Sequence, residues 1–142
     1  MRKTAVLLSL LASLSFGEDL SYNRFFLVDR IFLMPFVFKY ADDLGVDEEQ
    51  MERIKAFVKE NEREIERNIK ILRYMEKKAK LMILNGEDGD KLRELLTDIS
   101  TVKRELSLLN AKSVRFLKEV LTPEQFDRLR NIALVRLFEF QQ

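Results

Sequence analysis

Residues 121–130 read LTPEQFDRLR and residues 46–55 read VDEEQMERIK, so one ten-residue phrase occurs twice in the chain. Glu, Gln and Arg are identical at its fourth, fifth and eighth positions, and almost every other position holds a chemically similar pair. The one difference in kind is Glu48 against Pro123. The repeat predicts that two distant parts of the chain share one local structure.

Each phrase has the signature of a helix start. Asp47 and Thr122 are strong N-cap residues, whose side-chain oxygen accepts a backbone N–H from the first turn. Gln50 and Gln125 follow three residues later, where a side chain reaches back to the N–H of the cap and completes a capping box. Hydrophobic staples, negative charge at the positive helix end and a proline at the first helical position are supplied by Val46, Leu121, Glu49, Glu124 and Pro123.

The first residues, MRKTAVLLSLLASLSFGED, have the layout of a secretory signal peptide. A basic start is followed by an apolar run and by small residues at Ser15 and Gly17. An uncleaved anchor is the alternative, but a run of about a dozen residues falls short of the roughly 20 that span a bilayer. We expect a signal peptide over residues 1–17, a single domain over residues 18–142, a periplasmic location and no stable membrane insertion.

The composition excludes several classes of function. With no His and no Cys, the chain lacks disulfides, thiol catalysis, thiolate metal sites and the usual general base. We therefore predict no enzyme, no metal site and no cofactor. The 25 basic and 24 acidic residues nearly balance, and removal of Arg2 and Lys3 leaves a formal charge of about −1. This balance predicts no nucleic-acid partner.

Apolar residues with a seven-residue period predict a long helix from Asp47 to about Leu84. Its two seam rows are Met51, Val58, Ile65, Leu72 and Ala79, and Ile54, Asn61, Asn68, Met75 and Met82. Asn85 and Gly86 supply a C-terminal stop. The acidic turn that follows lacks the ligand pattern of a calcium loop.

A second long helix follows the turn, with Asp90 as its expected N-cap. Its seam is Leu92, Leu95, Ile99, Val102, Leu106, Leu109, Ser113, Phe116 and Val120. Because the turn is short, we expect the two long helices to be antiparallel neighbours. A last helix is expected from Pro123 to about Phe138.

Two surfaces are candidates for binding. The segment before the first phrase is rich in phenylalanine, including Phe25, Phe36 and Phe38, and Pro35 is expected to bend or divide a helix there. These rings either cover the long helices as core or form an apolar surface that captures other chains. Four basic residues of the first long helix lie opposite its seam and form either a solvated face or part of the same surface: Lys59, Arg63, Lys70 and Lys77.

The paired phrases resemble the LTxxQ-motif family, which includes the Spy and CpxP periplasmic proteins. Residues 121–125 match the motif in full, and the first copy keeps Gln50 while Val46 and Asp47 replace Leu-Thr. The resemblance covers most of the chain after residue 17. It implies an all-α fold built on a long antiparallel helical hairpin with flanking shorter helices, which pairs into a thin curved homodimer. It also implies a chaperone or stress-response accessory without catalysis.

The leading functional hypothesis is an ATP-independent chaperone that binds unfolded or misfolded envelope proteins and limits their aggregation. Its client surface would combine the three phenylalanines with the four basic residues. The alternative is a regulatory accessory that docks on the periplasmic domain of a sensor kinase responsive to envelope stress or metal. A helical spacer and an enzyme rank below both.

Overall fold

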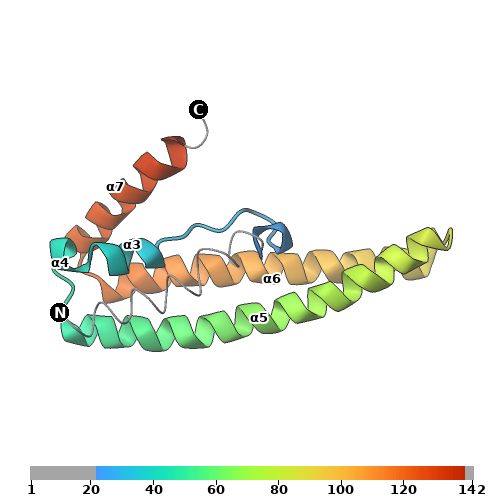
Figure 1. The fold of residues 1–142 in the computed structure, drawn as a ribbon, viewed down its shortest axis with the longest axis horizontal. Helices are drawn as coiled ribbons and strands as arrows, with labels where there is room; N and C mark the ends of the chain where they lie inside the picture. The colour runs from blue at the N-terminus through green and yellow to red at the C-terminus, as the bar shows by residue number, and fades with distance from the viewer. Residues whose placement is uncertain (1–21, 140–142) are drawn as a thin grey trace.

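The computed structural model describes residues 22–139, and these residues form helices and connecting segments without a strand (Figure 1). The expected signal peptide and the expected mature N-terminus lie outside the described residues. In chain order the elements are η1 (Asn23–Phe25), α3 (Met34–Lys39), α4 (Ala41–Leu44), α5 (Glu48–Leu84), α6 (Asp90–Val120) and α7 (Pro123–Glu139). The predicted all-α class is confirmed for this part of the chain.

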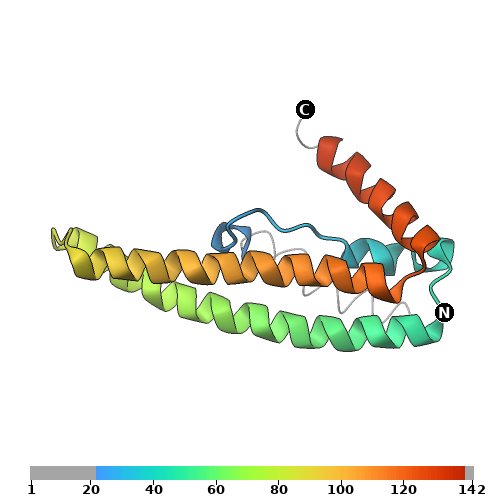
Figure 2. The same ribbon diagram turned by 180° about the vertical axis from the view of Figure 1, so that it is seen from behind.

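The long helices α5 and α6 lie side by side along most of their length and dominate the molecule (Figures 1 and 2). α5 has 37 residues and α6 has 31, so α5 extends about 56 Å at 1.5 Å per residue. α5 ends where the sequence predicts, and Gly86 follows with a φ of 78°, in the left-handed region that glycine adopts readily.

The prediction that Asp90 caps α6 is wrong. Gly89 is the N-cap and Asp90 is the first helical residue. The Asp90 carboxylate lies 3.3 Å from the Arg93 guanidinium, and it makes no cap hydrogen bond to the backbone. An acidic residue in the first turn still suits the helix dipole, so the boundary shifts by one residue and the helix is otherwise as expected.

The buried side of the long helices follows the predicted seams in part. In α5 the predicted residues Ile54, Asn61, Ile65, Leu72 and Ala79 are buried, whereas the remaining seam residues of α5 are half-buried. Ile69 and Leu117 are buried although neither belongs to a predicted seam. They face a third layer, because Ile69 clusters with Phe25 and Phe26, and Leu117 clusters with Val37 and Phe38.

The third layer is the segment that precedes the first phrase. Residues 22–33, here called the strap, run along the long helices and lead into α3 (Figure 1). Apart from its first turns the strap is not helical, and Pro35 lies in the first turn of α3. Pro35 therefore starts a helix, because a proline there removes no intrahelical hydrogen bond. The expectation from the sequence that Pro35 bends or divides a helix is therefore wrong.

The last helix, α7, projects away from the long helices (Figures 1 and 2). It packs through Leu129 and Ala133 into the core cluster that contains α3 and the adjoining ends of α5 and α6. Leu134 and Val135, further along, are 38% and 58% exposed. Leu129 and Ala133 thus anchor α7 to the body, while Leu134 and Val135 remain exposed.

Leu72 tests the packing between the layers. It is fully buried in the cluster shared by the strap, α5 and α6. We expect Leu72→Ala to lower the free energy of unfolding by about 2–5 kcal/mol, because it removes buried methyl groups and leaves a cavity. Chemical denaturation followed by circular dichroism measures this loss. Leu108→Ala is the matched control, since Leu108 is 55% exposed and should change stability by less than about 0.5 kcal/mol. Equal effects of the two variants would contradict the described packing.

Candidate functional site

The two copies of the repeated phrase build two capping boxes. At the start of α5, Gln50 N donates to Asp47 Oδ1 at 2.8 Å and Asp47 N donates to Gln50 Oε1 at 3.0 Å. At the start of α7, Gln125 N donates to Thr122 Oγ1 at 3.2 Å and Thr122 N donates to Gln125 Oε1 at 2.9 Å. Both predicted capping boxes are confirmed.

The two boxes also contact each other. Gln50 Nε2 donates to Gln125 Oε1 at 2.8 Å, and Gln125 Nε2 lies 3.4 Å from Gln50 Oε1. Each amide then donates to the residue two places before the other cap: Gln50 Nε2 to the Val120 carbonyl at 3.1 Å, and Gln125 Nε2 to the Gly45 carbonyl at 2.9 Å. The contact is reciprocal, as if a two-fold axis related the two phrases.

Every hydrogen-bonding position of these two amides is used. A glutamine side chain has two N–H donors and an oxygen with two lone pairs, and each of the two makes two donations and accepts twice. Because Gly45 ends α4 and Val120 ends α6, the pair joins the ends of two helices to the beginnings of two others. The repeated glutamine therefore has a tertiary role in addition to its role in capping.

The apolar residues of both phrases close the same end of the molecule. Leu121 is buried in the core cluster formed by α3, α7 and the adjoining ends of α5 and α6, and Val46, Met51 and Phe126 pack against this cluster. These four residues occupy the predicted staple positions. The remaining motif residues, Glu49, Pro123 and Glu124, are exposed, as expected for helix-start residues that act through charge or backbone conformation.

The prediction that Phe25, Phe36 and Phe38 form an exposed surface is contradicted for two of them. Phe25 is 1% exposed and Phe38 is 2% exposed, because Phe25 of the strap clusters with buried residues of α5 and α6, while Phe38 of α3 clusters with buried residues of α5, α6 and α7. Phe36 is half-buried and stacks on Tyr40 with ring centroids 6.5 Å apart. Phe25 and Phe38 are core residues, which was the other interpretation that the sequence left open.

The four predicted basic residues are all on the surface of α5. Lys59, Arg63, Lys70 and Lys77 are exposed, and among them Arg63 lies 3.9 Å from Glu60. They share the side of the helix that points away from α6. The structure thus keeps this half of the predicted surface and separates it from the buried phenylalanines.

Sequence reasoning missed the apolar residues that accompany these basic ones. Tyr74 is 69% exposed and Leu81 is 52% exposed. Each follows a buried seam residue, Leu72 or Ala79, by two places, and so points about 200° away from it around the helix. The signal that could have found them is an apolar residue at a heptad position outside the seam. We call Lys70, Tyr74, Lys77 and Leu81 the outer face.

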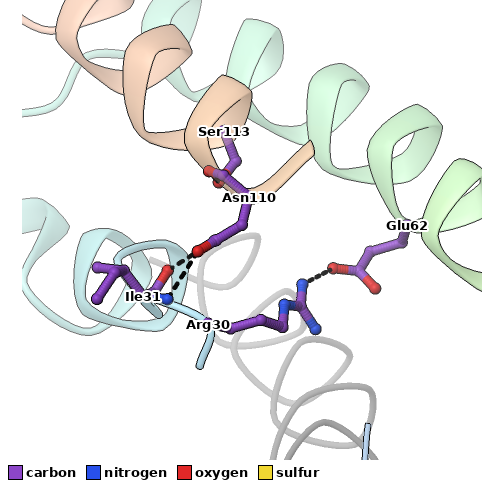
Figure 3. Close-up of polar contacts among 5 residues, drawn as sticks. All are labelled: Arg30, Ile31, Glu62, Asn110 and Ser113. Atoms are coloured by element: carbon purple, nitrogen blue, oxygen red, sulfur yellow. Dashed lines mark hydrogen bonds and ion pairs between the residues drawn. The ribbon is translucent and has the colours of Figure 1, made fainter. Parts of the chain in front are cut away.

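A second concentration of polar contacts holds the strap on the long helices (Figure 3). The amide of Asn110 in α6 binds the backbone of Ile31 twice: Ile31 N donates to Asn110 Oδ1 at 2.8 Å and Asn110 Nδ2 donates to the Ile31 carbonyl at 3.0 Å. Arg30 Nη2 donates to Glu62 Oε1 of α5 at 2.9 Å. Ser113 donates to the Asn110 carbonyl at 2.7 Å, which satisfies a buried hydroxyl on the same side.

Residues 22–139 contain no group of three or more acidic side chains placed to hold a metal ion. None of the helices described there is both long and apolar enough to cross a membrane.

Comparisons of the chain with protein-family models, with curated proteins and with solved structures found no match.

The reciprocal glutamine contact can be tested with a double-mutant cycle. We expect Gln50→Ala and Gln125→Ala each to lower the free energy of unfolding by about 1–3 kcal/mol, because each leaves partly buried partners without hydrogen bonds. The double variant should lose less than the sum, with a coupling energy of about 0.5–3 kcal/mol. Urea unfolding of all four proteins gives that coupling.

Glu49→Ala and Glu124→Ala form the control cycle, since both residues belong to the same phrases and both are exposed. Their effects should add within about 0.5 kcal/mol. Additive losses in the glutamine cycle as well would show that the two amides do not interact in solution.

Proposed function

We propose that this protein is an ATP-independent periplasmic chaperone that binds unfolded envelope proteins and limits their aggregation. The observation that carries the proposal is the outer face of α5. There Tyr74 and Leu81, both more than half exposed, lie among Lys70 and Lys77 on the side opposite the buried seam.

The chemistry of the outer face suits reversible binding to unfolded chains. Tyr74 and Leu81 lie about two turns apart on one side of α5, and unfolded proteins expose the apolar residues that could pack on them. The neighbouring lysines attract negatively charged segments from a distance and so raise the rate of encounter. Capture by a small surface is weak, which lets a client leave and fold without nucleotide hydrolysis.

We also propose that the long helices form an antiparallel hairpin that pairs with a second copy into a thin curved homodimer. Supporting this proposal, α7 projects from the body and leaves Leu134 and Val135 exposed (Figures 1 and 2). The described chain is also thin, with two long helices and one strap in its central part. A second copy would cover apolar residues that one copy leaves in water.

Variants of the outer face test the chaperone proposal. Tyr74→Ser with Leu81→Ser should weaken client binding by about 1–3 kcal/mol for each side chain that is buried against a client. Lys70→Glu with Lys77→Glu should slow capture mainly at low salt, because charges are screened beyond about 10 Å at 0.1 M. Light scattering of several unrelated unfolding proteins, without ATP, measures protection, and stopped-flow mixing measures capture.

Matched controls lie on α6. Leu108→Ser and Lys112→Glu change exposed residues of the same types and should leave protection unchanged. If the folded outer-face variants protect clients as well as the parent does, the assignment of the surface is wrong. If the parent protects no client but binds one sensor-kinase periplasmic domain tightly, the regulatory alternative replaces the chaperone proposal.

Dilution tests the homodimer. We expect molecular mass and helicity to fall together as the protein is diluted, since an obligate dimer has no stable folded monomer. Sedimentation velocity and circular dichroism over the same concentrations make the measurement. Val135→Asp should move the transition to higher concentration by placing a charge in the proposed contact. A monomer that stays fully helical at micromolar concentration would refute this arrangement.

A further inference from the structure

The strap is held through its backbone. Leu27 N and Val28 N both donate to Ser107 Oγ of α6, at 3.0 and 3.2 Å. One turn further along α6, Asn110 binds both the N–H and the carbonyl of Ile31 (Figure 3). Four main-chain groups of an extended segment are thus satisfied by two side chains three residues apart. Contacts of this kind do not depend on the sequence of the segment that is bound.

By contrast, side chains of the strap occupy positions that accept only particular types of residue. Phe25 and Phe26 are buried among α5 and α6 residues such as Ile69, Leu72 and Leu106. These rings supply the apolar contacts of the strap. The face of the long helices under the strap therefore accepts two adjacent aromatic residues.

Basic residues of the strap pair with acidic residues of α5 on either side of these rings. Arg24 Nη1 lies 3.1 Å from Glu76 Oε2, and Arg30 Nη2 lies 2.9 Å from Glu62 Oε1. Glu62 and Glu76 are 14 residues apart, or about 21 Å along a helix. Arg24 lies in the 3-10 turn Asn23–Phe25 and Arg30 lies in the irregular part of the strap, so the strap between them, with its aromatic pair, spans the distance between the two acidic groups.

Side chains of α5 and α6 hold the middle of the strap. Residues 29–33 have no regular secondary structure, and Ser107, Asn110 and Glu62 bind residues 27–31 through their side chains. Leu27 and Val28 are 59% and 68% exposed. Phe25 and Phe26 are buried on one side of them and Arg30 on the other, so the exposed middle of the strap is the part that we expect to open at the lowest cost.

We propose that the face beneath the strap is a binding site for a segment of an unfolded client that carries two adjacent aromatic residues between two basic ones, and that the strap occupies this site in the free protein. The inference rests on the proposed chaperone function for the identity of its ligand. The strap then competes with the client segment for this face within the same chain. It covers the apolar face until a client segment replaces it.

Peptide binding to strap variants of the full chain tests the proposal. The probe is a fluorescent synthetic peptide with the sequence of residues 22–33, YNRFFLVDRIFL, and a scrambled peptide is its control. A strap-loosened variant combines Phe26→Ala with Arg30→Ala. If the open face is about 10% populated or less in the parent, the loosened variant should bind the probe about ten-fold more tightly or better by anisotropy.

Changes on the face itself should reverse that gain. Adding Ser107→Ala and Asn110→Ala to the loosened variant should remove most of the increase, because these side chains hold the backbone of the ligand. A probe with both arginines replaced by glutamate should bind the loosened variant more weakly than the original probe. Asp29→Ala, at an exposed strap position, is the control variant and should leave probe affinity at the parent value.

Hydrogen exchange of the unaltered protein gives a second measurement that does not depend on the loosened variant folding. The N–H groups of Leu27, Val28 and Ile31 should lose protection when excess probe is added, while those of the α5 and α6 seams stay protected. Folded variants with unchanged affinity, or strap amides that stay protected at saturating probe, would overturn the proposal. A gain in affinity that occurs only with exchange of straps between two copies, seen as a change in mass, would also overturn it.

The two levels of inference fail separately. If the probe binds as expected but the parent does not delay aggregation of any client, the site stands and the chaperone proposal fails. If the parent delays aggregation while loosening of the strap changes neither probe binding nor protection, the chaperone proposal stands and the strap is a structural cover only.

Discussion

The structure depends on the reciprocal contact between Gln50 and Gln125. Each side chain completes a capping box at the start of its own helix and binds the other amide at the same time. Through the carbonyls of Gly45 and Val120, the pair also holds the residues that end α4 and α6. Four helix termini therefore meet at the two glutamine amides, whose donors and acceptors are all hydrogen-bonded. Each phrase needs the other, which explains why the chain contains both.

Away from this point, polar residues mark where the strap crosses the long helices. Ser107 and Asn110 bind strap backbone, Glu62 binds Arg30, and Ser113 is buried beside them. Within residues 22–139 the buried Asn61 Oδ1 has no hydrogen-bond partner, a cost that apolar packing on either side must offset. A polar section in an apolar seam disfavours other registers, because a shift would bury these groups without partners.

The distribution of apolar residues separates the binding surfaces of the protein into two kinds. Phe25 and Phe26 of the strap are buried against α5 and α6, whereas Tyr74 and Leu81 on the outer face are exposed to water. The proposed function uses the open surface for first encounter, and the proposed strap site would hold a client segment more specifically. Arg24 pairs with Glu76 and Arg30 pairs with Glu62 of α5. These two ion pairs favour one register of the strap along α5.

The sequence by itself determined the features that local interactions control. Capping residues within three places of each other, seven-residue apolar spacing and Gly86 specified the bounds of α5, α6 and α7 to within about one residue and placed the four basic residues on the exposed side of α5. Only the tertiary structure decided which phenylalanines are core, that Ile69 and Leu117 face a third layer, and that Gln50 and Gln125 meet across 75 residues of chain. Local periodicity records which side of a helix is buried, but it carries no information about which distant segment buries it. The strap and the glutamine pair both depend on such distant contacts.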